Sequence, residues 1–229
     1  QIPSVSYFRF CAELLEKYKD DMRIECICGF NHLGVYKDVD YDYFFSRQGS
    51  IWGIATWRNR YMQYGDFSYG ESAYTMNLLK CRTKHNRIAW RRLNAYAKQS
   101  TYEGHVAGNE FWIEFNMYSQ NRLQIIPQKN MISNIGATGN SSHSAEINKL
   151  PRGIRKVFNS KVYDVDFPLK INDYVIPDVK YEKKRNRIMG YNYSIINFYR
   201  KFERFVRILA SGDMMLLKKK LKRNIQIEK

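Results

Sequence analysis

A pair of glutamates and a histidine are the residues of this chain best suited to acid–base or ligand chemistry. Glu110 and Glu114 are four residues apart, so a helix would place both carboxylates on one face. A carboxylate can take the proton of a hydroxyl group, and the positive end of a helix favours its ionised form in the first turn, where we expect Glu110. His143 ends a segment rich in Gly, Ser and Asn. Its imidazole could bind a metal ion or donate to a phosphate oxygen.

Glycines and a tryptophan lie near these groups in motifs that suit close contact with a ligand. Gly136 and Gly139 precede His143 and would let the backbone approach phosphate oxygens. In the segment SRQGSIWGIATW, Gly53 permits a turn while Trp52 offers a flat ring for a sugar. Arg47 in the same segment is a further polar contact for a ligand.

The order of these segments resembles that of bacterial nucleotide-diphospho-sugar transferases of the GT-A type, including proteins labelled hemolysin-activation-like. In that family a WGxATW segment precedes an acidic helix, and an SNIG segment ending in His follows the helix. Residues 52–57, 110–117 and 133–143 keep this order here. The resemblance covers about residues 1–180.

The resemblance implies transfer of a sugar from a nucleotide-diphosphate donor to a glycan or lipid-linked acceptor, in surface polysaccharide biosynthesis. Glu110 falls where the family usually has Asp, so it is the predicted general base, and Glu114 is the second catalytic candidate. The implied residues for the donor diphosphate are Asn134, Gly136, Gly139 and His143. The implied residues for the acceptor are Trp52, Gly53 and Arg47.

The family also implies a divalent metal ion, Mn²⁺ or Mg²⁺. His143 is the one ligand predicted here, because the family's acidic metal motif and its donor-binding strands precede the segment that begins at Gln1. We therefore expect residues 1–229 alone to be inactive in transfer. Asp38, Asp40 and Asp42 form a second acidic alternation, but it follows the first helix and lacks the Gly and distal Glu of a calcium loop.

The charge distribution leaves several partners open. The net charge is +16, and residues 180–229 hold 15 Lys and Arg against 4 Asp and Glu. Such a surface suits an anionic membrane, a phosphate-bearing substrate or nucleic acid. No nucleic-acid-binding motif accompanies it, so a basic nucleic-acid-binding protein ranks behind the transferase. It also ranks behind a non-catalytic carbohydrate-binding or assembly module, which would keep the aromatic residues without the active centre.

Periodicity predicts an α/β fold. Apolar residues at helical spacing indicate helices over residues 4–18, 84–98 and 110–120. Short β-rich runs indicate strands over 24–30, 123–126 and 130–135, with a loop over 136–144. A basic helical tract follows over 193–222, interrupted at 211–213. Trp57 is expected in the core, with Arg58 and Arg60 pointing outward.

These elements suggest two parts. Residues 1–180 would form the acceptor-side part of a GT-A-like domain without its N-terminal donor-binding strands. Residues 181–229 would form a basic amphipathic tail, which either docks on the protein body or lies on the inner face of a membrane. The chain has no apolar run long enough to span a membrane and no zinc-like cysteine spacing. It is therefore expected to be cytoplasmic, with buried, reduced thiols.

Overall fold

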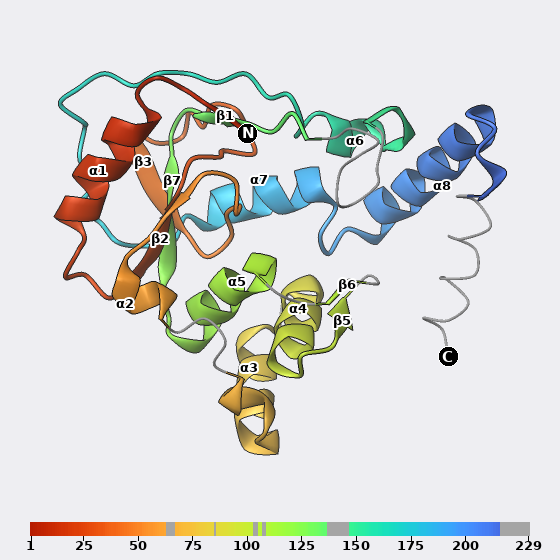
Figure 1. Ribbon diagram of the computed structural model, residues 1–229, viewed down its shortest axis with the longest axis horizontal. Coiled ribbons are helices and arrows are strands. Elements are labelled where there is room, and N and C mark those ends of the chain that lie inside the picture. Colours follow the sequence, from red (N-terminus) through yellow and green to blue (C-terminus); the bar gives the residue numbers. More distant parts are fainter. Residues whose placement is uncertain (63–66, 85, 103–104, 107–108, 137–146, 216–229) are drawn as a thin grey trace.

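The computed structural model describes residues 1–62, 67–84, 86–102, 105–106, 109–136 and 147–215, with backbone alone for 101–102, 105–106, 109–110 and 149. The described fold is α/β, as predicted. Its centre is a four-stranded sheet in the order β3-β7-β2-β4 (Figure 1). Strands β2 (Ile24–Cys28) and β7 (Leu123–Pro127) are parallel, while β3 (Tyr43–Ser46) and β4 (Ile54–Ala55) run antiparallel to their neighbours.

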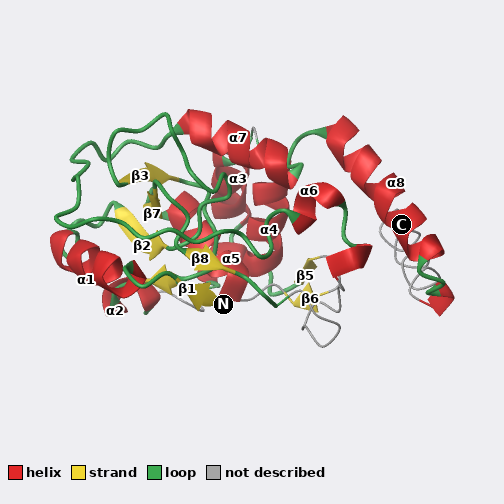
Figure 2. Cartoon of the chain, turned by 90° about the horizontal axis from the view of Figure 1, so that it is seen from above, coloured by secondary structure: helices red, strands yellow, loops and turns green. Residues whose placement is uncertain are grey.

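Helices lie on both sides of this sheet. Helix α1 (Tyr7–Lys17) covers one face, while α5 (Asn109–Ser119) and α7 (Val179–Met189) lie on the other side (Figures 1 and 2). Strands β2 and β7 are buried along their whole length, as expected for parallel strands covered on both faces. The sheet and α1 share one hydrophobic cluster.

A second layer of helices packs against α5. Helices α3 (Ala73–Arg82) and α4 (Arg87–Ala97) form with α5 a second cluster of buried apolar side chains. The side chains of Ser72 and Asn86 accept hydrogen bonds from the first turns of α3 and α4, which defines where these helices begin. The amphipathic pattern predicted α4 and α5, but α3 was missed because its apolar residues do not gather on one face.

The remaining elements are short, apart from the last helix. They are β1 (Ile2–Pro3), α2 (Arg58–Tyr61), η1 (Ser68–Gly70), β5 (Thr101–Tyr102), β6 (His105–Val106), β8 (Ile132–Ser133), η2 (Ile147–Lys149), α6 (Arg152–Arg155) and α8 (Ser194–Ala210). Helix α8 confirms the first part of the predicted basic tract, and β8 is shorter than predicted. Most of helix α7 lies within residues 181–229, which were predicted as a basic amphipathic helical tail, but the periodicity did not indicate a separate helix there. None of the described helices is long and apolar enough to cross a membrane.

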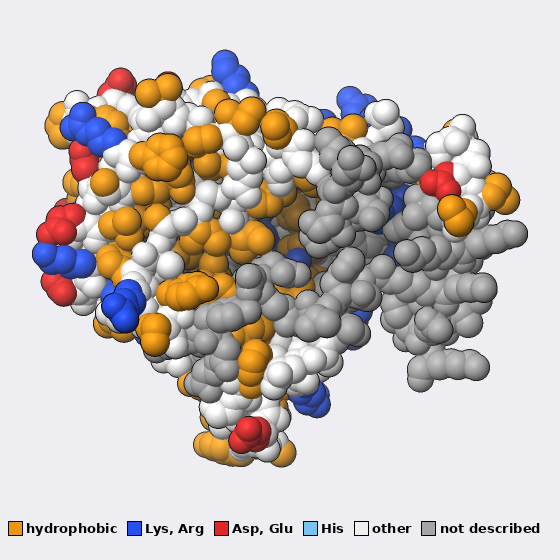
Figure 3. Space-filling model, viewed as in Figure 1, with side chains coloured by type: hydrophobic (Ala, Val, Ile, Leu, Met, Phe, Trp, Pro, Cys, Tyr) orange, Lys and Arg blue, Asp and Glu red, His pale blue; other side chains and the backbone are white. Residues whose placement is uncertain are grey.

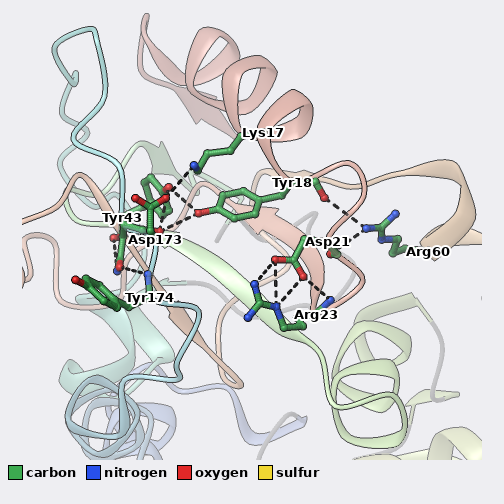
Figure 4. A network of polar contacts seen from close by, with 9 residues as sticks. Lys17, Tyr18, Asp21, Arg23, Tyr43, Arg60, Asp173 and Tyr174 are labelled. Carbon is green, nitrogen blue, oxygen red and sulfur yellow. Dashed lines mark hydrogen bonds and ion pairs between the residues drawn. The ribbon is translucent and has the colours of Figure 1, made fainter.

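The prediction that Arg60 points outward is wrong, because its side chain is fully buried. Its guanidinium stacks on Trp57 at 4.6 Å and donates to the backbone carbonyl of Lys19 at 3.0 Å. It also donates to the backbone carbonyl of Asp21 at 3.1 Å (Figure 4). The last carbonyls of a helix lack partners within it, and a guanidinium carries enough donors to satisfy several. Arg60 therefore closes the turn between α1 and β2.

Several polar contacts of Lys17, Tyr18 and Tyr43 tie the segment around Asn172 to α1 and the sheet. The hydroxyls of Tyr18 and Tyr43 lie 2.8 Å apart, and Tyr18 donates to the carbonyl of Asn172 at 2.9 Å (Figure 4). Lys17 pairs with Asp173 at 3.0 Å. These contacts hold the long connection to α7 across the end of α1.

Three of the four cysteines are buried and all four are free. Cys11, Cys26 and Cys28 agree with the predicted buried thiols, whereas Cys81 is exposed. Burial raises the pKa of Cys11 and of Cys28 to about 11, so both thiols stay protonated near neutral pH.

A buried ion pair joins the two parallel strands to α5. Glu25 in β2 accepts from Arg122 at 2.9 Å and from the amide of Asn116 at 3.0 Å, and both charged side chains are nearly inaccessible to water. Burial raises the pKa of Glu25, against the lowering effect of Arg122 and Asn116. The carboxylate is therefore costly to bury and depends on its two donors.

We predict that Glu25→Gln lowers the free energy of unfolding by about 3–5 kcal/mol, because Arg122 then stays buried without its carboxylate partner. The double variant Glu25→Leu with Arg122→Met removes both charges and should recover most of that loss. Chemical denaturation would measure both effects. The control is Glu16→Gln, which breaks the exposed pair with Lys19 and should leave stability nearly unchanged. Equal, small losses for Glu25→Gln and Glu16→Gln would contradict the prediction.

Candidate functional site

The candidate site lies where the parallel strands β2 and β7 end. Just beyond β2, the backbone amide of Gly29 donates to the carbonyl of Gly53 at 2.6 Å, and the amide of Met131 donates to the carbonyl of Gly29 at 3.0 Å. The chain following each parallel strand therefore meets the Gly53 turn. The carboxyl ends of parallel strands are the usual place for a ligand site in an α/β sheet.

Gly53 is required by both its backbone conformation and its surroundings. Its φ is +61°, and a Cβ there would lie 2.5 Å from Cγ1 of Ile132 and 3.2 Å from the hydroxyl of Tyr7. The amide of Gly53 donates to the side-chain oxygen of Gln1 at 2.9 Å. The turn predicted at Trp52-Gly53 thus packs directly on β8, where the SNIG segment begins.

The start of the chain lies in the same place. Strand β1 pairs antiparallel with β8, joining Ile2 to Ser133 and Pro3 to Ile132, and the amide of Ser4 donates to the carbonyl of Met131 at 2.8 Å. The start of the chain, the Gly53 turn and β8 therefore share one small surface. In the space-filling view, hydrophobic side chains gather over this sheet side of the molecule (Figure 3).

The ring of Trp52 is partly exposed at this surface and is held by two phenylalanines. Its centroid lies 4.7 Å from that of Phe30 and 5.3 Å from that of Phe158. Two aromatic neighbours fix the orientation of the ring, which suits a sugar-binding role. Sequence reasoning missed Phe158, because nothing in its local pattern indicates a partner more than one hundred residues away.

Part of the predicted donor-binding segment is described. Asn134 follows β8, and its side-chain oxygen accepts from the amide of Gly136 at 2.9 Å. Its backbone carbonyl accepts from Asn159 at 3.1 Å. These contacts hold the segment of Asn134 and Gly136, which directly follows β8. The other two predicted residues, Gly139 and His143, lie outside the described residues.

Helix α5 carries Glu110 in its first turn and contacts β2 (Figure 1). It runs obliquely to the strands and leads into the start of β7 through a short connection. Ile54, next to Gly53, packs on the cluster that contains Phe111 and Trp112. The side chain of Glu110 itself is outside the described part of the chain.

Glu114, one turn further along α5, forms an ion pair. Its carboxylate lies 3.2 Å from the guanidinium of Arg92, with about 14% and 18% of the two side chains exposed. Arg92 also hydrogen-bonds the hydroxyl of Tyr191 and lies 5.4 Å from the ring of Phe111. Glu114 therefore joins α5 to α4, and Arg92 extends the contact to Tyr191 just beyond α7. This contact favours a positioning role for Glu114 and leaves Glu110 as the stronger candidate for a base.

Two arginines flank the ring of Tyr191. The guanidinium of Arg92 lies 4.8 Å from its centroid and that of Arg185 lies 5.2 Å away. Arg185 is buried and donates to the carbonyl of Gly49 at 2.9 Å, in the segment that leads to Trp52. Sequence reasoning missed all three residues. Arg185 is the only one with a signal, since it lies at helical spacing from Tyr181 on the inward face of α7.

Arg47, a predicted acceptor contact, lies at the opposite end of β7. The preceding residue, Ser46, pairs with Gln124 near the start of that strand. Arg47 lines a cavity of about 330 Å³ with Arg23 and Arg82. The structure therefore does not bring Arg47 together with Trp52 and Gly53.

The described residues include no group of three or more His, Cys, Asp or Glu side chains placed to hold a metal ion. In the acidic alternation, Asp38 pairs with Lys184 at 2.6 Å and Asp42 accepts from the amide of Lys170 at 2.7 Å. These carboxylates serve structural contacts. A metal ion therefore remains a prediction of the family resemblance, with no ligand set among the described side chains.

No protein-family model, curated protein or solved structure matches this chain.

His32 packs on Phe30, which also packs on Trp52, so its titration tests the packing of the site. Its ring is 4.9 Å from that of Phe30, and its Nδ1 is shielded from water with no hydrogen-bond partner among the described residues. Burial, together with the charge of Arg185, lowers the pKa of His32 well below its usual value. The folded protein thus keeps this imidazole neutral at pH values where the unfolded chain would bind a proton.

We predict a pH-dependent loss of stability from this histidine. Above pH of about 6.5 the imidazole is neutral in both states, so it adds no pH dependence. As pH falls below that value, only the unfolded chain takes up the proton, and the free energy of unfolding should fall by up to about 1.4 kcal/mol per pH unit. Denaturation of the natural chain and of His32→Gln between pH 7 and pH 5 would measure it. Parallel curves for the two proteins would contradict the lowered pKa.

Proposed function

We propose that this chain is part of a GT-A-type glycosyltransferase that moves a sugar from a nucleotide-diphosphate donor to a glycan or lipid-linked acceptor. One observation carries the proposal. The Trp52-Gly53 turn packs on β8, at the carboxyl end of the parallel strands. Two of the three segments that resemble the family by their order thus lie side by side, and Ile54, next to Gly53, packs on the cluster to which α5 contributes.

In this proposal Glu110 accepts the proton of the acceptor hydroxyl. A general base must be anionic before the reaction, and the first turn of a helix stabilises that form. The Glu114–Arg92 pair and Tyr191 hold α5 against α4 and α7, which fixes the position of Glu110. The partly exposed ring of Trp52 offers its apolar surface to a sugar.

The donor side is proposed at Asn134 and Gly136, with Gly139 and His143 following them in the sequence. Backbone amides released by a loop rearrangement are suitable donors to a diphosphate. In the described structure the amide of Gly136 is bonded to Asn134, so donor binding would exchange that contact for one with the ligand. Dependence on Mn²⁺ or Mg²⁺ is proposed from the family resemblance only.

We predict that Glu110→Gln lowers turnover about two to four powers of ten while the sugar nucleotide still binds. Gln keeps the size of the side chain but cannot take the proton. The protein would be assayed for release of the nucleotide from a panel of sugar nucleotides, with Mn²⁺ and with a chelator. Calorimetry with the same nucleotides would measure binding separately.

The matched control is Glu114→Gln on the same face of α5. Because Glu114 is assigned to positioning, its variant should lose less turnover and should also be less stable. A collapse for Glu114→Gln with normal turnover for Glu110→Gln would move the base one helical turn. Normal turnover in both would rule out a carboxylate base on this helix. Glycan binding without any nucleotide release would indicate a carbohydrate-binding module, and salt-sensitive binding of oligonucleotides alone would indicate a nucleic-acid-binding protein.

A further inference from the structure

Helix α8 exposes its apolar face to solvent. Ile195, Phe198, Tyr199, Phe202, Val206 and Leu209 recur at helical spacing, and between 44% and 75% of each side chain is exposed. Met214 and Met215 continue the patch with 53% and 83% exposed. The helix lies at the end of the molecule farthest from α1 (Figures 1 and 2). An exposed apolar patch of this kind on a protein surface marks a site of contact with another protein or a membrane.

The opposite, polar face of α8 holds the helix to the rest of the protein. Arg200 donates to the carbonyl of Ile188, and a Cβ at Gly153 would lie 2.7 Å from its guanidinium. Glu203 accepts from the backbone amide of Arg152 at 3.0 Å and from Arg207 at 2.8 Å. The usual arrangement of an amphipathic surface helix is therefore reversed, because Arg200, Glu203 and Arg207 contact the protein while most of the apolar side chains face out.

This orientation argues against docking of the apolar face on the protein body. Of the apolar side chains on α8, Ile208 is the one that is fully buried. Moving the apolar face inward would require the helix to rotate and would break the contacts of Arg200 and Glu203. The apolar face is thus already available to a partner without any change in the helix.

The charges around the patch select the kind of partner. Of the four basic residues of α8, Lys201 is exposed, while Arg200, Arg204 and Arg207 are half-buried. The one acid of the helix, Glu203, is also half-buried and is bonded to Arg207 and to the amide of Arg152. A second copy of the chain would carry the same net charge of +16, so pairing two copies would bring like charges together. The exposed side of α8, which is apolar apart from Lys201, instead complements an anionic lipid surface.

We propose that α8 docks on an anionic membrane surface, with Phe198, Phe202 and their apolar neighbours inserted among the lipids and the exposed Lys201 near the headgroups. The helix stays attached to the body through Arg200 and Glu203 while it is docked. This proposal is independent of the proposed sugar transfer.

The test is co-sedimentation of residues 1–229 with vesicles of phosphatidylcholine and phosphatidylglycerol. The natural chain should bind these vesicles, bind pure phosphatidylcholine at least about tenfold more weakly, and dissociate as salt rises well above about 0.1 M. Phe198→Ser with Phe202→Ser should weaken binding about tenfold or more, because two inserted rings are lost. Phe8→Ser is the matched control, since Phe8 and Phe198 are equally exposed at 69%. It should bind as the natural chain does.

Each other outcome would overturn the proposal. Equal binding of the double variant and the Phe8→Ser control would show that the patch does not insert. Absence of binding to anionic vesicles at low salt would exclude the membrane. A chain that sediments as a dimer and becomes monomeric in the double variant, without vesicle binding, would assign the patch to self-association. A large fall in the melting temperature of the double variant would show that the chain itself covers this face.

Discussion

The parallel pairing of β2 with β7 is the constraint on which the rest of the described structure depends, and a buried ion pair specifies it. Glu25 lies in β2, Arg122 directly precedes β7, and Asn116 lies in α5, so a single carboxylate joins both strands and the helix. A charge in the core tolerates few arrangements, because any shift in register would leave it without donors. Since α5 leads into β7 by a short connection, fixing β7 on β2 also fixes where α5 ends.

The candidate site follows from that arrangement. Both parallel strands end at the same edge of the sheet, and Gly29 and Gly53 allow the chains beyond them to pack closely there. The helical side of the site is held by charged and aromatic contacts, in which Arg92 links Glu114 to Tyr191 and Arg185 links the same ring to Gly49. The C-terminal end of α7 therefore lies beside the candidate site. The same end leads into α8, so α7 connects the proposed site with the proposed membrane contact.

Local pattern was sufficient for most elements that carry an apolar face. The helices α1, α4, α5 and the first part of the basic tract were predicted, as were β2 and β7, because a 3.6-residue or continuous apolar pattern is independent of distant neighbours. Helix α3 has no such pattern, and α7 is mostly charged, so packing rather than periodicity defines both. Arg60 shows the same limit, since its charge indicated solvent while unpaired carbonyls at the end of α1 required a buried donor.

The sequence by itself determined the α/β class, the order of the motifs, the two glutamates on one helix and the separation of the basic region from them. The tertiary structure alone decided which of these residues meet. It brought Trp52-Gly53 to β8, placed Arg47 at the far end of β7, and paired Glu114 with Arg92. It also turned the charged face of α8 inward. These outcomes depend on contacts between residues tens of positions apart, and such contacts are set by the packing of whole elements rather than by the residue types near each position.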